Sequence, residues 1–226
     1  KQRWGIHMRN SKDPYDTYSY IQHFSKNQKL EVLFFFLLGD YAQYDKNIRF
    51  DHPKMISLIK QLGNTSTIGI HPSYASNKNS KMIGIEKQRL EHILGKSVHH
   101  NRFHFLKFSL PKSYQQLLAY GITDDYSMGY ADQIGFRAGT CTPFNFYDLE
   151  NEVQTDLKVH PFAYMDGVLN DHLNLNKETA LDKVQILRKN VAEVKGTFTS
   201  IWHNESLSNV DRWSGWQEVF EGSWKL

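Results

Sequence analysis

Residues Leu30–Leu38 read LEVLFFFLL, an almost continuous apolar run that ends at Gly39-Asp40. Leucine, valine and phenylalanine in such a run favour a β-strand that is buried on both faces, rather than one that alternates between core and solvent. Strands of that kind belong to parallel sheets, whose two faces are both covered by other elements. The run therefore predicts a parallel α/β arrangement around it.

The rest of the chain favours the same arrangement, because short β-type runs alternate with amphipathic segments. Helices are expected at 16–27, 53–62, 86–94, 111–120 and 180–194, and further strands at 67–70, 102–108, 121–124, 135–137, 159–162 and 197–202. Strands and helices joined by short connections are typical of βαβ units in one sheet or barrel. We predict a single α/β domain over residues 1–226, with 1–14 as an irregular leader and a terminal helix within 210–226.

Charge and composition exclude several classes of function. The formal net charge is +3, and the basic residues are scattered among acids, so we expect no nucleic-acid partner. The single cysteine, Cys141, excludes an internal disulfide and a cysteine-only metal site. The longest apolar run, Val32–Leu38, is too short to span a membrane, and no signal peptide is visible. The compartment, cytoplasm or cell envelope, and the oligomeric state stay open.

Titratable residues follow several of the expected strands. In parallel α/β folds the ligand site lies at the carboxyl ends of the strands, and those ends here carry Asp40, His71, Arg137 and His203. Histidine could bind a divalent metal or exchange a proton near neutral pH, and arginine could orient a carboxylate or a substrate oxygen. The alternatives are structural: a histidine that holds a loop, or a buried ion pair of Arg137. His104 begins an expected strand, which leaves its place uncertain.

Four segments, in this order, resemble the polysaccharide deacetylase (NodB homology) family. Phe34–Gly39 resembles the family's phenylalanine-rich second strand, and His71 matches the first histidine of its H-S/T-x-x-H motif. Phe136-Arg137 matches a later F-R motif, and Ile201-Trp202-His203 matches a closing L-x-H motif. The resemblance covers residues 30–203. The segments DPYDTY, FFFLLGDY, GFRAGTCTPF and WHN are closer still to a bacterial branch of deacetylase-like proteins.

The resemblance implies a distorted (β/α) barrel that uses a divalent metal, zinc being the first choice, to remove acetyl groups from a polysaccharide or glycoconjugate. It implies His71 as a metal ligand, His203 as the acid that protonates the leaving group, and Arg137 as the residue that orients an aspartate. Asp40 or His104 could supply a missing ligand, with His104 as the second metal ligand and Asp40 as a catalytic carboxylate.

Substrate contacts are expected from Tyr74, Trp202 and Asp132. Two departures from the family pattern bear on the activity. Ala75 stands where the family has its second metal histidine, and nothing in residues 1–29 resembles the family's first motif, a strand that ends in paired aspartates. We expect that strand and motif either to lie upstream of this chain or to be absent from the polypeptide.

Two other functions fit the same residues. One is a catalytically inactive barrel that binds a glycan through aromatic side chains such as Tyr74, Trp202 and Trp213. The other is a glycoside hydrolase, which needs two carboxylates roughly 5–10 Å apart, for example Asp40 with Asp124 or Asp125. Metal content separates the deacetylase from both, because neither alternative needs zinc.

Overall fold

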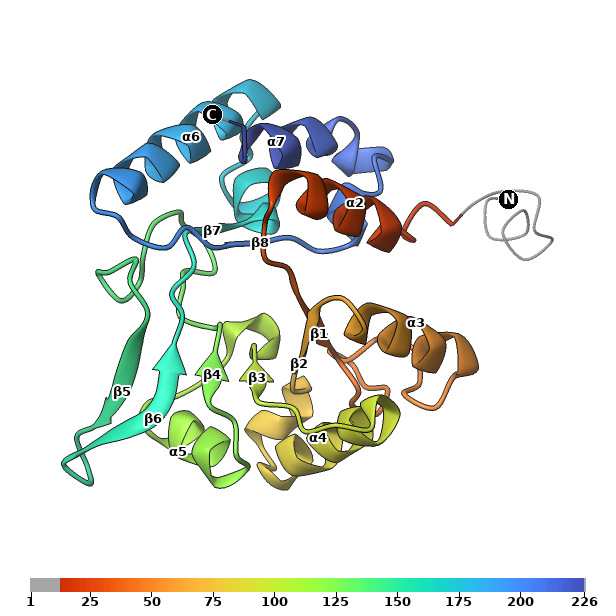
Figure 1. The fold of residues 1–226 in the computed structure, drawn as a ribbon, viewed down its shortest axis with the longest axis vertical. Helices are drawn as coiled ribbons and strands as arrows, with labels where there is room; N and C mark the ends of the chain where they lie inside the picture. The colour runs from red at the N-terminus through yellow and green to blue at the C-terminus, as the bar shows by residue number, and fades with distance from the viewer. Residues whose placement is uncertain (1–12, 226) are drawn as a thin grey trace. The chain divides into compact units, whose positions relative to one another are not determined.

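The computed structural model describes residues 13–225. These residues form two compact units, whose elements are labelled in Figure 1. The unit made of residues 13–31, Asp132–Gly135 and 163–225 is called the helical unit. The unit made of Val32–Ala131 and Phe136–Phe162 is called the sheet unit.

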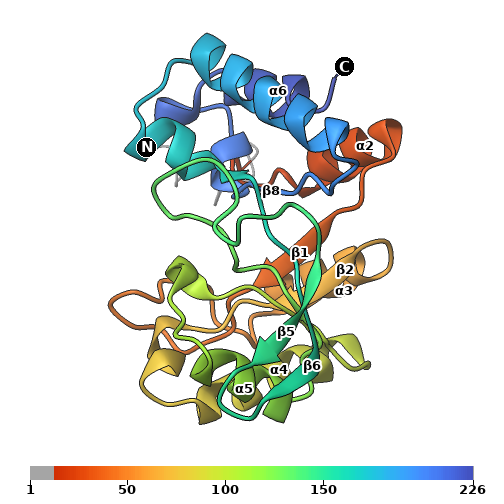
Figure 2. The same cartoon turned by 90° about the vertical axis from the view of Figure 1, so that its left-hand side faces the viewer.

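The sheet unit is built on a six-stranded sheet with the spatial order β1-β2-β3-β4-β6-β5. β1, β2, β3, β4 and β6 pair in parallel, and β5 joins β6 as an antiparallel hairpin at one edge (Figure 2). The strands are β1 (Leu33–Phe36), β2 (Thr67–Ile70), β3 (His100–Asn101), β4 (Asp124–Asp125), β5 (Phe144–Asp148) and β6 (Val153–Val159). The carboxyl ends of the five parallel strands therefore share one edge of the sheet.

Three α-helices and two short 3-10 turns connect these strands. The helices are α3 (Pro53–Gly63), α4 (Lys81–Leu94) and α5 (Lys112–Ala119), and the turns are η1 (Tyr74–Asn77) and η2 (His104–Leu106). α3 begins with proline at its first position, where the missing N–H costs nothing, and the His52 ring accepts a hydrogen bond from Lys54 N. α4 ends at Gly95, which adopts the left-handed conformation that favours glycine.

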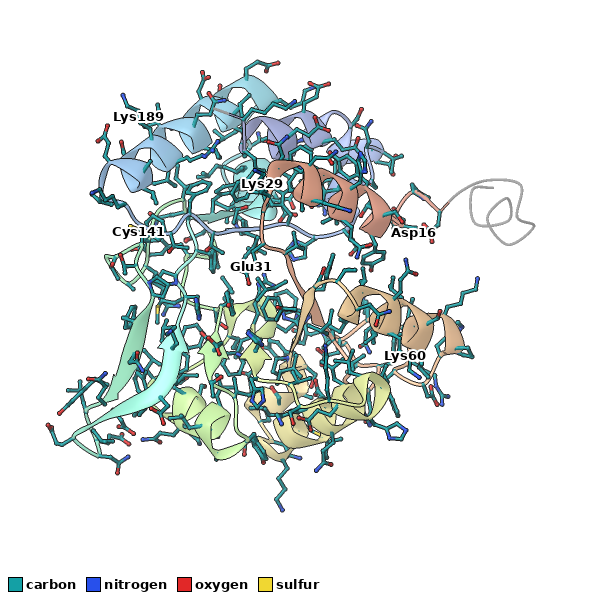
Figure 3. The ribbon with its side chains drawn as sticks, in the orientation of Figure 1. Asp16, Lys29, Glu31, Lys60, Cys141 and Lys189 are labelled. Atoms are coloured by element: carbon teal, nitrogen blue, oxygen red, sulfur yellow. The ribbon has the colours of Figure 1, made fainter. Side chains whose placement is uncertain are left out.

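The helices bury their apolar faces and expose their polar ones. Ile59, Leu90 and Leu117, one from each of the three helices, are fully buried, as are Ile70 and Leu157 from the strands. Burying an aliphatic side chain of this size contributes about 1.5–3 kcal/mol. On the exposed faces lie charged residues such as Lys60 of α3 and, in the helical unit, Lys189 of α6, both labelled in Figure 3.

The helical unit contains a short parallel strand pair and the longest helix. Its elements are α2 (Tyr18–Gln28), β7 (Tyr164–Met165), the π-helix η3 (Val168–His172), α6 (Lys177–Glu193), β8 (Ser200–Ile201), η4 (Glu205–Leu207), η5 (Asp211–Trp213) and α7 (Trp216–Gly222). Phe24 of α2, Leu207 and Phe220 of α7 form a buried cluster against which Trp202 packs. These aromatic contacts fix the segment after β8, which carries His203.

The prediction of an α/β fold with mainly parallel strands is confirmed. The expected helices at 53–62 and 111–120 and the strand at 67–70 match α3, α5 and β2 closely. A distorted barrel stays a prediction. None of the helices in the described part of the chain has both the length and the apolar character needed to cross a bilayer.

Two predicted strands are wrong. Residues 135–137 form a turn, in which Gly135 has a φ of 108°, so Arg137 does not follow a strand. Residues 102–108 are not extended either, because Phe103 N donates to the Ser127 hydroxyl and Phe105 has a left-handed φ of 55°. The β5–β6 hairpin was not predicted, since its strands carry exposed polar residues such as Asn145 and Asp156 and lack a continuous apolar run.

Candidate functional site

His71 and His104 lie at the carboxyl ends of two neighbouring parallel strands in the sheet unit. His71 follows β2 directly, and its backbone N–H donates to Phe36 O at 2.9 Å, which extends the pairing with β1. His104 lies in η2, beyond the end of β3 at Asn101. The sequence placed His104 at the start of a strand. It follows one instead, and its ring packs edge-on against that of His71 with 4.8 Å between the centroids.

Backbone carbonyls fix which nitrogen of each ring carries the proton. His71 Nδ1 lies 2.5 Å from Arg102 O, and His104 Nε2 lies 3.0 Å from Tyr44 O. A carbonyl oxygen only accepts, so both of these nitrogens donate. In neutral imidazoles the remaining nitrogens, His71 Nε2 and His104 Nδ1, both carry lone pairs, and they face each other at 2.9 Å. Two lone pairs at this distance repel unless a cation, either a proton or a metal ion, lies against both.

The separation of the two facing nitrogens can be compared with that of two ligands on one metal ion. Zinc binds histidine nitrogen at about 2.0–2.1 Å in tetrahedral sites, which puts two ligand nitrogens about 3.4 Å apart. The 2.9 Å between the facing nitrogens of His71 and His104 is the length of an N–H···N hydrogen bond, so two zinc ligands would need the rings to lie about 0.5 Å further apart. Their other nitrogens donate to carbonyls, as the outer nitrogens of metal-binding histidines do. Within residues 13–225 no group of three or more His, Cys, Asp or Glu side chains is arranged for a metal, so the chain offers at most these two histidines together in its described part.

Two buried carboxyl groups hold the loop that follows His71. Asp45 accepts hydrogen bonds from Tyr74 N at 2.7 Å and Ala75 N at 3.3 Å, and one of its oxygens lies 3.9 Å from His104 Nε2. Glu86 of α4 accepts from Ser73 N at 2.9 Å and from the Ser73 hydroxyl at 2.5 Å. Burial raises the pKa of Glu86 to about 7, although the two Ser73 bonds oppose the rise. Neither carboxyl was predicted as functional.

Three aromatic rings, of which those of Tyr44 and Phe105 are exposed, pack together beside His104. Tyr44, Tyr74 and Phe105, together called the aromatic surface, come from the segments after β1, β2 and β3. Their ring centroids lie 4.5 Å (Tyr44–Tyr74), 5.9 Å (Tyr74–Phe105) and 6.2 Å (Tyr44–Phe105) apart. Lys107 Nζ donates to the Tyr74 hydroxyl at 2.6 Å and lies 4.4 Å from the centre of that ring. Only Tyr74 of this group was predicted to contact substrate.

His203 lies in the helical unit, where the carboxyl ends of β7 and β8 bring it to Asp166. Its Nδ1 donates to Asp166 Oδ1 at 2.8 Å and its backbone N–H to Asp166 Oδ2 at 2.6 Å, while the Ser206 hydroxyl also donates to Oδ2. Asp166 is fully buried, whereas the His203 side chain is 52% exposed. Burial alone would raise the pKa of Asp166, but His203 and the other donors hold it below its ordinary value. A buried carboxylate thus orients an imidazole that is half exposed.

Asp166 was not predicted. Its signal is the run Phe162-Ala163-Tyr164-Met165, which leads into Asp166-Gly167 in the same way as the first strand leads into Gly39-Asp40. The strand was expected to end at 162, four residues before the carboxylate. The structure places β7 at Tyr164–Met165, so that Asp166 is the first residue after it.

Asp40 and Arg137, the other two predicted catalytic residues, contact Arg89 and Phe108. Asp40 is 72% exposed and forms an ion pair with Arg89 Nη2 at 3.0 Å, and Arg89 Nη1 donates to Leu38 O. Arg137 is exposed, and its guanidinium lies 5.1 Å from the centre of the Phe108 ring. This stacking takes the place of the buried ion pair that was the alternative for Arg137. The catalytic roles of Asp40 and Arg137 stay predictions.

The predicted substrate contacts differ in their exposure. Trp202 is half-buried, donates from Nε1 to the Tyr164 hydroxyl at 3.3 Å and packs edge-on against Phe220. Asp132 is exposed in the helical unit. Trp213, suggested for glycan stacking, is only 4% exposed, so its ring serves the core.

The paired acids at β4 have separate roles. Asp125 is fully buried and accepts hydrogen bonds from Asn101, Tyr114 and Ser127, and burial raises its pKa although these donors oppose the rise. It ties β3, β4 and α5 together. Asp124 accepts from His160 Nε2 at 2.8 Å; burial would raise the pKa of Asp124, but hydrogen bonds from Thr123 and His160 hold it below its usual value.

No protein-family model matches the chain, and a search of curated proteins gave no significant match.

Proposed function

We propose that the protein is a metal-dependent hydrolase that removes acetyl groups from a polysaccharide or glycoconjugate, with His71 and His104 as metal ligands. A distorted (β/α) barrel of the deacetylase type is part of this proposal. The observation that carries it is the pair of facing nitrogens, His71 Nε2 and His104 Nδ1, whose outer nitrogens are fixed by carbonyl acceptors. The pair lies at the carboxyl edge of a parallel sheet, where such folds bind ligands, and this position supports the proposal of a bound cation.

A divalent metal bound there would polarise a carbonyl oxygen and lower the pKa of a water molecule. The residues around His71 and His104 would hold these two ligands in place. Arg102 O and Tyr44 O orient the rings, and Asp45 lies 3.9 Å from His104 Nε2, where its negative charge favours a nearby cation. Ala75, at the position of the family's second histidine, donates its backbone N–H to Asp45 and so contributes to the same loop.

The Asp166–His203 pair supports hydrolysis independently. Because Asp166 accepts from His203 Nδ1, Nε2 is the atom that can receive or deliver a proton. A buried carboxylate in this position holds the imidazole in one tautomer and one orientation. We propose that His203 acts as a general acid, with Asp166 as its positioning residue.

The test is acetate release from N-acetylated chitin oligosaccharides and from acetylated xylan, measured with the full chain after addition of zinc, cobalt or EDTA. We expect activity that depends on added metal and falls at least 100-fold in His71→Ala and in His104→Ala. His92→Ala, an exposed histidine of α4, is the matched control and should keep full activity. Metal-independent release, or release unaffected by both substitutions, would refute the proposal.

A catalytically inactive glycan-binding protein is the second candidate. It is favoured by the exposed aromatic surface and by the two-ligand character of the histidine pair in the described residues. Binding of the same oligosaccharides in EDTA, without acetate release under any metal condition, is the result that this candidate predicts.

A further inference from the structure

Phe105 has an unusual backbone conformation although its side chain is not buried. Its φ is 55°, and the next residue, Leu106, has a φ of 50°, so two consecutive residues with side chains occupy the left-handed region. That region is unfavourable for a residue with a bulky side chain. Leu106 is buried, but Phe105 is 60% exposed. The strain at Phe105 therefore does not bury its ring, and strain at an exposed side chain is a feature of ligand sites.

The strained backbone brings the Phe105 ring to two tyrosines. Its plane is nearly perpendicular to both rings, at 87° to Tyr44 and 87° to Tyr74, and the tyrosines are inclined to each other by 41°. The rings therefore form an angled surface, not a parallel slot that would sandwich a flat aromatic ligand. A sugar ring fits an angled surface, because its C–H face can stack on one ring while its edge contacts another.

Lys107 lies at the edge of this aromatic surface. Lys107 is exposed, and its ammonium has three hydrogens, of which the Tyr74 hydroxyl accepts one. Its position 2.6 Å from that hydroxyl places positive charge beside the ring of Tyr74. A phosphate backbone would need a series of such cations, and the basic residues of the chain are scattered among acids.

We propose that the aromatic surface and Lys107 bind an acidic sugar, namely a pyranose that carries a carboxylate. The sugar stacks on Phe105 and the tyrosines, and its carboxylate accepts from Lys107. This inference deepens the proposed function, on which it rests for the choice of a carbohydrate, by assigning the substrate class as a uronate-containing glycan.

Binding is measured by calorimetry with the full chain in EDTA, using a β-1,4-linked hexamannuronate and, as the neutral probe, cellohexaose. We expect the uronate to bind at least 10-fold more tightly at low salt, with an advantage that shrinks as salt is added. Lys107→Gln should abolish the preference for the uronate, and Lys107→Arg should restore most of it.

Phe105→Gly separates a ligand role from a structural one. Glycine tolerates the left-handed φ, so we expect the melting temperature to be unchanged or raised while uronate affinity falls at least 10-fold. Phe105→Asn is the second variant if the glycine variant fails to fold, since asparagine also tolerates this region. Tyr147→Ala, which removes an exposed ring from β5, is the control and should bind as the unmodified chain does.

Equal affinity for the two hexasaccharides, or uronate binding that Phe105→Gly leaves unchanged, would overturn the inference. Tighter binding of a single-stranded RNA hexamer than of the uronate, with the same dependence on Phe105 and Lys107, would overturn it too. Because binding is measured in EDTA and without an acetyl group, a failure to release acetate does not affect this result. The two proposals can therefore fail separately.

Discussion

Glu86 offers a test of the electrostatics beneath the candidate site. Its carboxyl group is 1% exposed, and its partner is Ser73, two residues after His71. Burial raises its pKa from 4.5 to about 7; the two hydrogen bonds from Ser73 and the positive charge of Arg89 oppose the rise, and the negative charge of Asp45 adds to it. Glu86→Gln keeps the shape of the side chain and resembles the protonated acid.

The size of the effect follows from the two pKa values. Between pH 4.5 and about 7 the folded protein holds a proton that the unfolded chain releases, so the free energy of unfolding decreases as the pH rises through this window. A difference of about 2.5 between the pKa values, at about 1.4 kcal/mol for each unit, gives about 3 kcal/mol. The neutral amide of the Glu86→Gln variant does not titrate and would have no such loss. We therefore expect the variant to match the unmodified chain within about 1 kcal/mol at pH 5 and to exceed its stability by about 3 kcal/mol at pH 8.

Urea unfolding followed by circular dichroism at pH 5 and pH 8, at equal ionic strength, measures this change. Other titrating groups are common to both proteins and cancel in the difference. Glu193→Gln, an exposed carboxylate of α6, is the control and should change stability by less than about 0.5 kcal/mol at either pH. A Glu86→Gln variant that is no more stable than the unmodified chain at pH 8 would refute the reasoning.

Two further substitutions probe other parts of the structure. Asp166→Asn removes the carboxylate that orients His203; we expect acetate release to fall at least 30-fold with little change in KM, and stability to fall by about 1–3 kcal/mol at pH 7. Since the pKa of Asp166 is held low, this stability difference should shrink as the pH falls below about 4, and a difference constant down to pH 2 would contradict the assignment. Gly129→Ala would bring a Cβ into steric conflict with the Phe162 ring. Urea unfolding should show that the free energy of unfolding falls by about 1–3 kcal/mol. An unchanged urea midpoint would show that the ring can move aside.

The parallel part of the fold could be predicted because its strands are apolar on both faces. The apolar runs around Phe34 and at Thr67–Ile70 are stable only in a sheet whose two faces are both covered. The helices of this part of the chain show clear apolar faces. The β5–β6 hairpin lies at an edge with one face in water, so its strands carry polar residues and give a weaker pattern. Phe103 and Phe105 alternate like a strand, but a left-handed turn determines their conformation.

The histidines of the candidate site were predictable, but their partners were not. His71 and His203 directly follow apolar runs, so their places at strand ends can be read from the sequence. Asp45 and Glu86 lie in a loop and on a helix, and only the folded chain brings them to the loop after His71. The link between His71 and His104 depends on a turn that local patterns did not predict.

The most direct test of the central claim is a calorimetric titration of the metal-free full chain with zinc, repeated for His71→Ala, His104→Ala and the control His92→Ala. The account predicts about one ion per chain for the unmodified protein and for His92→Ala, and at least a 10-fold loss of affinity in each of the other two variants. No zinc binding by the unmodified chain, or binding that persists in both His71→Ala and His104→Ala, would contradict it.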